Sequence, residues 1–202
     1  LIFFGFDGVQ QYVTTYFDAA GVTPVGFTSL LIIYIVFALA NPVAAVVVSR
    51  IGAKRSMLAA VGFYTLYCLA LTSAQPPLIY VASALLGAAG AMLWTAQNSY
   101  LIRASDTAVY GANAGFFSTL FALGAAGGVF IFGLLFPVLG YKTGFILFAL
   151  VPLLALVPLL RLQDIRVEVK VNKWLEMKRA LVRITALRMA AIWFAFTFIQ
   201  GL

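Results

Sequence analysis

An acidic side chain, Asp7, lies inside the first hydrophobic run of the sequence, residues 1–17. If this run spans a bilayer as a helix, Asp7 lies about 15 Å below the surface, near the middle of a hydrocarbon core about 30 Å thick. A carboxylate facing lipid at that depth costs on the order of 3 kcal/mol, so we expect it to face a protein interior instead. There it can bind a proton or a cation.

Three hydrogen-bonding residues, Gln10, Gln11 and Thr14, follow Asp7 by three, four and seven positions. This spacing places all four residues on one face of a helix. The sequence therefore predicts a polar stripe that binds a solute. The alternative is that the glutamines only bridge neighbouring helices.

A second polar face is predicted in the run 78–101, where small, aromatic and amide residues recur at steps of three and four. They are Ser83, Gly87, Gly90, Trp94, and Gln97 or Asn98. The glycines let another helix approach closely. We expect the two amides to hydrogen-bond a solute and Trp94 to stack against it or to gate it. A place for Trp94 in an interfacial aromatic belt is the alternative.

The composition is that of a polytopic membrane protein. Hydrophobic residues make up 64% of the chain, charged residues 9%, and the mean hydropathy is +1.06. A water-soluble domain of this size could not bury so much apolar surface. The net charge of +7 does not indicate a nucleic-acid partner, because the bases are confined to short loops and one linker.

Chemistry at a metal or a nucleophile is not expected. The chain has no His and one Cys, Cys68, so it offers no Cys/His metal site and no disulfide framework. No nucleophile is paired with a base, and no phosphate-binding glycine loop is followed by Lys. The sequence therefore predicts a protein that is not an enzyme and that carries no cofactor.

Six apolar runs have spanning length, and they predict an all-α membrane fold. The runs are 1–17, 29–49, 56–74, 78–101, 112–135 and 143–160. In the second run, Pro42 removes a backbone donor and predicts a bend. A seventh run begins near residue 186 and stops at 202 before it could cross. The sequence opens directly inside a hydrophobic helix, so we expect a trimmed start.

The positive charges are distributed asymmetrically between successive loops. Of the thirteen Lys and Arg residues, only Lys142 lies in an odd-numbered loop; the others lie in the even-numbered loops and after the sixth run. By the positive-inside rule, the even-numbered loops and the linker are cytoplasmic. We expect an integral, multi-pass protein of the plasma membrane.

The second loop carries Arg50, Gly52, Lys54 and Arg55. These residues match the signature between the second and third helices of the major facilitator superfamily, which the loop resembles. Ala45 and Ser49 replace the Gly and the Asp of that signature. In the superfamily the Asp and its bases latch the cytoplasmic helix ends together, so the resemblance implies a gating motif that lacks its acid.

The fourth run is similar to the Unc-ninety-three-like branch of the same superfamily. The matching residues are Gly87, Leu93, Trp94, Gln97, Tyr100 and Leu101, followed by Gly111 and Gly115. Superfamily members that move protons often have an Arg where this chain has Ser83. The resemblance implies a twelve-helix protein, of which this chain supplies the first six helices and the start of the seventh.

Glycine pairs in the fifth run predict close helix packing. They are Gly111 with Gly115 and Gly124 with Gly128, each pair at a spacing of four. A weak echo between 51–54 and 139–142 predicts two inverted three-helix repeats, with the first and fourth helices as counterparts. No Pro accompanies these glycines before Pro137, so an antiporter is not predicted.

The chain is expected to divide into three parts. Residues 1–162 form an N-terminal six-helix half, residues 163–185 an amphipathic cytoplasmic linker, and residues 186–202 the start of helix 7. The expected partners are the lipid bilayer, a missing C-terminal six-helix half, and a small molecule or ion as substrate.

Two functions remain open from the sequence. The first is a solute transporter that works by alternating access, with Asp7 coupling transport to a proton or cation. The second, implied by the Unc-ninety-three resemblance, is a protein that regulates or escorts a channel or receptor and transports nothing. A polar cavity favours the first function, and an apolar groove with a membrane-protein partner favours the second.

Overall fold

A computed structural model describes residues 1–165 of the chain, and every described element is a helix. Their bounds are α1 Ile2–Ala19, α2 Thr23–Ile51, α3 Ala53–Leu71, α4 Pro76–Ala104, α5 Tyr110–Leu139, α6 Tyr141–Leu154 and α7 Leu156–Arg161. The described residues belong to one compact unit. The expected amphipathic linker and the start of helix 7 lie outside the described residues, apart from positions 163–165.

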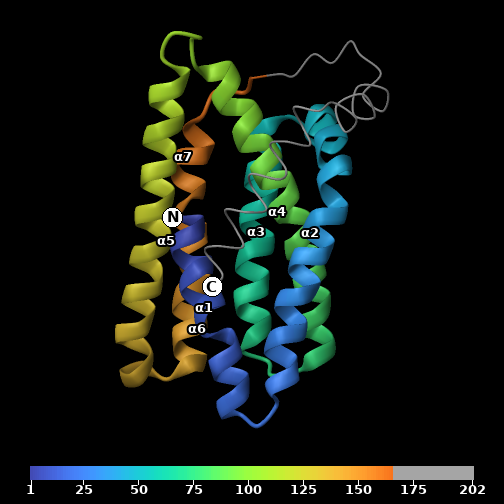
Figure 1. The fold of residues 1–202 in the computed structure, drawn as a ribbon, viewed down its shortest axis with the longest axis vertical. Coiled ribbons are helices and arrows are strands. Elements are labelled where there is room, and N and C mark those ends of the chain that lie inside the picture. Colours follow the sequence, from blue (N-terminus) through green and yellow to red (C-terminus); the bar gives the residue numbers. More distant parts are fainter. Residues whose placement is uncertain (166–202) are drawn as a thin grey trace, which may run out of the picture. The chain divides into compact units, whose positions relative to one another are not determined.

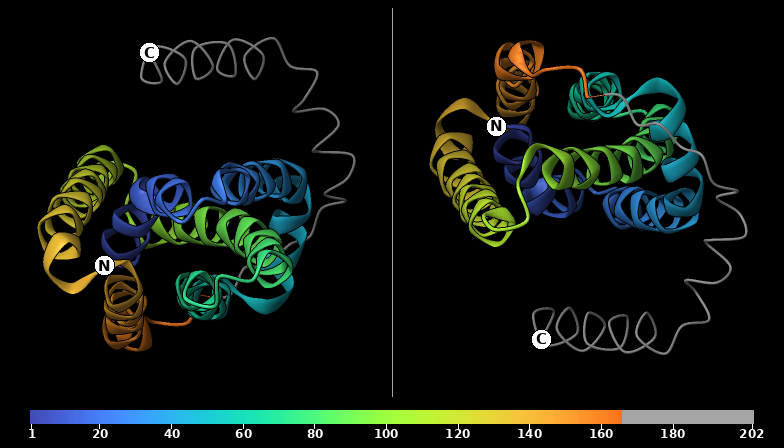
Figure 2. Two further views of the ribbon diagram at one scale, coloured as in Figure 1. Left: turned by 90° about the horizontal axis from the view of Figure 1, so that it is seen from below. Right: turned by 90° about the horizontal axis from the view of Figure 1, so that it is seen from above.

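The helices form a bundle in which packing partners come in matched pairs (Figures 1 and 2). Helix α4 packs on α2 and α3, and its counterpart α1 packs in the same way on α5 and α6. Helices α3 and α6 pack on each other. Exchanging α1 with α4, α2 with α5 and α3 with α6 therefore reproduces the packing pattern. The chain is an all-α, polytopic membrane protein, and its described helices α1 to α6 pack as two three-helix repeats.

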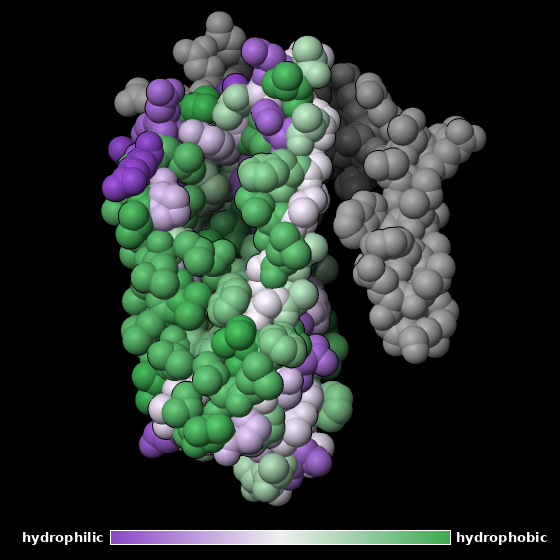
Figure 3. Space-filling view, turned by 90° about the vertical axis from the view of Figure 1, so that its left-hand side faces the viewer, coloured by the Kyte–Doolittle hydropathy of each residue, from purple (hydrophilic) through white to green (hydrophobic). Residues whose placement is uncertain are grey.

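Within residues 1–165, four segments are long and apolar enough to cross a membrane: Thr23–Ile51, Pro76–Ala104, Tyr110–Leu139 and Tyr141–Arg161. Six such segments were expected. Helices α1 and α3 do not meet the same measure, because the polar stripe of α1 and the tyrosines and Lys54–Arg55 of α3 lower their mean hydropathy. On the side of the bundle formed by α5, hydrophobic residues cover most of the surface between two more polar ends (Figure 3).

The sixth expected run is divided between α6 and α7. Pro152 lies inside α6 and lacks the amide proton that would bond the Phe148 carbonyl, and the helix ends at Leu154. By contrast, α2 continues through Pro42 to Ile51. Next to Pro42, the Asn41 side chain donates a hydrogen bond to the Phe37 carbonyl over 2.9 Å.

Helix crossings occur at glycines, and α1 uses two that the sequence analysis did not select. A Cβ atom on Gly8 would lie 2.8 Å from the Gly128 carbonyl oxygen, and one on Gly5 would lie 2.8 Å from the Phe148 carbonyl oxygen. Either distance is shorter than a real Cβ contact, so these positions admit only glycine unless the backbones separate.

The glycines expected to pack fall into two groups. Gly87 lies against Ile33 and Phe37 of α2, Gly90 against the Phe37 ring, and Gly128 against the backbone of Phe4. A Cβ on Gly111, Gly115 or Gly124 would meet no atom of the described chain within 4 Å. A packing role for these three stays a prediction about surfaces outside the described residues.

A buried hydroxyl cluster joins α2, α3 and α4. The Ser29 hydroxyl is 2.9 Å from the Tyr67 hydroxyl and 2.9 Å from the Ser83 hydroxyl, and Ser83 donates to the Ile79 carbonyl over 2.8 Å. All three side chains are fully buried. The cluster fixes the three helices to one another with every hydroxyl oxygen bonded.

Candidate functional site

The polar stripe of α1 meets several neighbours. Asp7 is half-buried and lies one helical turn after Phe3, whose ring centroid is 5.9 Å from that of Tyr64 on α3. Gln10 donates a hydrogen bond to the Tyr34 hydroxyl of α2. Thr14 lies where Gly26 of α2 crosses α1, and Gln11 is exposed. Asp7 and Gln10 thus occupy the side of α1 that faces α2 and α3.

Trp94 of α4 belongs to an aromatic cluster that brings three helices together. Its ring centroid lies 5.2 Å from that of Phe3 on α1 and 5.3 Å from that of Phe121 on α5. The rings of Phe3 and Phe121 are 4.8 Å apart and meet edge to face. Contacts of this kind stabilise each pair beyond the area they bury. We call Phe3, Trp94 and Phe121 the aromatic floor.

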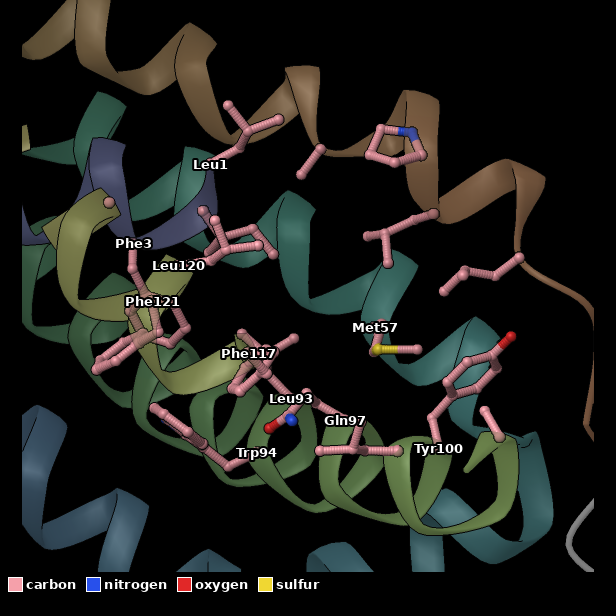
Figure 4. A pocket seen from close by; sticks show the side chains of 18 of the residues that line it. Leu1, Phe3, Met57, Leu93, Trp94, Gln97, Tyr100, Phe117, Leu120 and Phe121 are labelled. Carbon is pink, nitrogen blue, oxygen red and sulfur yellow. The ribbon is translucent and has the colours of Figure 1, made fainter. Parts of the chain in front are cut away.

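A cavity of about 530 Å³ begins at the aromatic floor and follows α4 toward the end of the bundle that carries Lys54, Arg103 and Arg161 (Figure 4). Trp94, Gln97 and Tyr100 lie along one side of it. The other walls come from α3, α5 and α7, and they are mainly apolar. Their members include Met57, Phe117, Leu120, Gly124, Pro158 and Leu162.

The structure divides the residues that were expected to share one site. Trp94 and Gln97 line the cavity, whereas Asp7, Gln10 and Thr14 do not, and Asn98 is exposed outside it. Asp7 lies one helical turn beyond Phe3, on the side of the aromatic floor away from the basic end. The described structure therefore separates an apolar cavity from an acidic site by one layer of rings.

Gln97 has an unusual environment within the cavity wall. Both atoms of its side-chain amide are inaccessible, and neither has a hydrogen-bond partner among the described residues. Leaving a buried amide unbonded costs about 1–3 kcal/mol. The amide is therefore a candidate contact for a polar group of a bound molecule, which it reaches when the side chain turns toward the cavity.

Lys54, at the start of α3, contacts the end of α7. The Lys54 Nζ donates hydrogen bonds to the carbonyl oxygens of Leu160 and Leu162, over 2.8 and 2.7 Å. Gly52, at φ 94°, makes the turn that brings Lys54 there. Arg50 and Arg55 are exposed, and Ser49 donates to the Val46 carbonyl over 2.6 Å. This contact joins the start of α3 to α7, the last described helix.

Several lining residues escaped the sequence analysis. Phe3, Phe117 and Phe121 are hydrophobic residues in hydrophobic runs, so nothing in their type or spacing distinguishes them from residues that face lipid. Tyr100 is distinguished in the sequence only as part of a family motif. The contact of Lys54 with α7 had no local signal either, because more than a hundred residues separate the partners.

A family model described as "Ion channel regulatory protein UNC-93" matches residues 20–196. The chain belongs to the Unc-93 family. The UNC93-like protein MFSD11 of Xenopus tropicalis is 34% identical over 134 residues, which are 66% of this chain and 29% of that protein. The protein of the same name from Xenopus laevis is 32% identical over 134 residues, with the same coverage. No solved structure matches the chain.

These relatives confirm the resemblance to the Unc-93-like branch of the major facilitator superfamily. The chain spans less than a third of the length of the relatives it matches. Together with the apolar helices, the family establishes an integral, multi-pass membrane protein. The family is described as regulating ion channels, and its description does not name an enzymatic activity.

Proposed function

We propose that the chain is part of a membrane transporter of the major facilitator type that works by alternating access. One observation carries the proposal. The cavity extends from the basic end of the bundle to the aromatic floor, and the acidic site of Asp7 lies beyond that floor. A path that a few side chains close part-way is the arrangement that alternating access requires.

Each site residue has a role in this scheme. Gln97 hydrogen-bonds the solute in the cavity, and Trp94 with Phe3 and Phe121 forms the gate. Asp7 and Gln10 then meet the solute or a coupling proton or cation once the gate opens. A second six-helix half would complete the pathway, and the positive-inside rule makes the basic end cytoplasmic.

Transport assays on the full-length protein in proteoliposomes test the proposal. A panel of radiolabelled small solutes is supplied with and without a proton or sodium gradient, and uptake is compared with that of an Asp7→Asn variant. We expect gradient-driven uptake of at least one solute, and a loss of roughly tenfold or more in the variant, since removing a buried charge at a coupling site is worth several kcal/mol.

Asp18→Asn is the matched control, because Asp18 lies on the same helix near its far end, exposed and hydrogen-bonded to Thr23 over 2.7 Å. This variant should transport like the parent. Gradient-coupled uptake that is unchanged in Asp7→Asn removes Asp7 from the mechanism. The absence of uptake for every solute and gradient contradicts transport itself.

Regulation of another membrane protein is the second candidate. It is supported by the mainly apolar cavity wall, by Ser49 in place of the latch acid, and by the description of the family. In that case a channel or receptor should co-purify with the full-length protein in stable proportion. Its surface current or surface abundance should also fall when this protein is removed, with no solute uptake in vesicles.

A further inference from the structure

The shape of the cavity restricts what can occupy it. Its lining runs along α4 from Leu93 to Ala104, which is about 16 Å of helix. About 530 Å³ is the space open to the centres of water-sized spheres, so over that length the cavity is roughly 6 Å wide for atom centres and about 9 Å wide between the surfaces of its walls. A helix with its side chains is about 10–12 Å wide, so a partner helix does not fit. One hydrocarbon chain or one row of rings does.

The chemistry of the wall restricts the occupant further. The inner part of the cavity is lined by Phe3, Trp94, Phe117, Leu120 and Phe121, which suit an apolar body. Within this wall Gln97 offers an amide without a partner. A water held there would need two to four polar partners. A hydrogen-bonding group that is part of an apolar molecule is held in place by the apolar wall. It can therefore pair with the amide without further polar partners.

We propose that this cavity binds a single-chain amphiphile, an elongated apolar molecule with one uncharged hydrogen-bonding group that pairs with the amide of Gln97. Gln97 lies one helical turn from Trp94, so the polar group sits near the aromatic floor and the apolar chain extends along α4 toward the basic end. The polar rim at the basic end, where Asn113 donates to the Ser105 hydroxyl over 2.9 Å, lies at the other end of the lining. The site combines a mainly apolar wall with a single orienting polar group, as small-molecule sites do. Whether the amphiphile is also the cargo rests on the proposed transport function.

Photolabelling of the full-length protein in nanodiscs tests this site without any gradient. The probe is a twelve-carbon alcohol that carries a diazirine, and the labelled residues are mapped by mass spectrometry. We expect label on residues of the cavity wall, displaced by unlabelled dodecanol at concentrations about three- to tenfold lower than by dodecane, the advantage that one hydrogen bond provides.

Three variants separate the contribution of the open cavity from that of the Gln97 amide. Gly124→Phe places a ring in the cavity from a position where a Cβ meets no described atom within 4 Å, so it should abolish the labelling. Gln97→Leu should remove the preference for the alcohol over the alkane while leaving the cavity labelled. Asn98→Leu changes the neighbouring exposed amide and should behave like the parent.

The outcomes are distinguishable from those of the transport assay. The site is contradicted if exposed residues of α5 such as Phe116 are labelled as heavily as the cavity, or if Gln97→Leu keeps the alcohol preference. If Gly124→Phe does not fold, the relative potency of dodecanol and dodecane in Gln97→Leu still tests the amphiphile site. Cavity labelling without solute uptake rejects the transport proposal and supports the amphiphile site. Solute uptake without cavity labelling supports transport and rejects the amphiphile site.

Discussion

The hydroxyls of Tyr67, Ser29 and Ser83 carry one proton each, and this sets the direction of the hydrogen bonds that join α2, α3 and α4. Ser83 donates to the Ile79 carbonyl, so it can only accept from Ser29. Ser29 then has no proton left for Tyr67, which must donate to it. The chain of bonds ends on a backbone carbonyl, and none of its three side chains lines the cavity. Ser83 therefore has a structural role here.

This direction predicts an order of stability among variants of the cluster. Ser83→Ala removes the acceptor of a buried donor and should lower the free energy of unfolding by about 1–3 kcal/mol. Tyr67→Phe removes only the first donor and should lower it by about 1 kcal/mol. Equilibrium unfolding in detergent measures the free energy of unfolding of both variants. Tyr80→Phe, at a half-buried hydroxyl with no hydrogen bond in the described part of the chain, is the control. The reverse order would show that the protons are arranged differently.

At the scale of the helices, α1 is held in the bundle by glycines rather than by its polar residues. Gly5 and Gly8 lie on the face that meets α6 and α5, while Asp7 and Gln10 lie toward α2 and α3. The close contact with α5 brings Phe3 near Phe121 and so contributes to the aromatic floor. The glycine face therefore positions the residues that close the cavity.

Gly128→Ala should separate α1 from α5, because a Cβ at this position would overlap the Phe4 carbonyl oxygen. Overpacking of this kind typically costs about 1–3 kcal/mol, and we expect a lower melting temperature in detergent. Gly124→Ala is a control on the same helix, where a Cβ has no described neighbour within 4 Å. Equal melting temperatures for the two variants would contradict the crossing.

Lys54 should hold the end of α7 in place. Lys54→Met removes both donors to the Leu160 and Leu162 carbonyls, and hydrogen exchange in residues 156–162 should become faster, by an amount equivalent to about 1–2 kcal/mol of local stability. Arg55→Met, at the exposed neighbour, should leave this exchange unchanged. If both variants behave like the parent, the contact with α7 does not stabilise that helix.

Sequence patterns predicted the features that depend on one helix and not those that depend on several. The spacing of Asp7 and Gln10 was sufficient to place them on one face, and the mean hydropathy was sufficient to predict a membrane bundle. Glycine spacing did not distinguish Gly128, which meets Phe4, from Gly124, which lines the cavity. The aromatic floor depends on three helices whose relative positions are set by tertiary packing, so its members looked like any other hydrophobic residues.

At the scale of the whole described bundle, the two three-helix repeats meet at the aromatic floor. Phe3 comes from α1 and Trp94 from α4, the counterpart helices of the two repeats, and Phe121 comes from α5. A change in the relative position of α1 and α4 would separate Phe3 from Trp94. The cavity would then be continuous with the site of Asp7, which is the step that the transport proposal needs.

Removing one ring of the floor should open the same path. Asp7→Cys provides a thiol beyond the floor, and Cys68, which is fully buried, reports the background reactivity. With a membrane-impermeant thiol reagent applied from the basic side, we expect Phe121→Ala to speed the labelling of Asp7→Cys by roughly tenfold, equivalent to a barrier lower by about 1.4 kcal/mol. Phe116→Ala, which removes a ring that is 67% exposed on the same helix, should have no effect. Fast labelling of Asp7→Cys with the floor intact would mean that the rings do not separate Asp7 from the basic end, and the proposed gate would have to lie elsewhere.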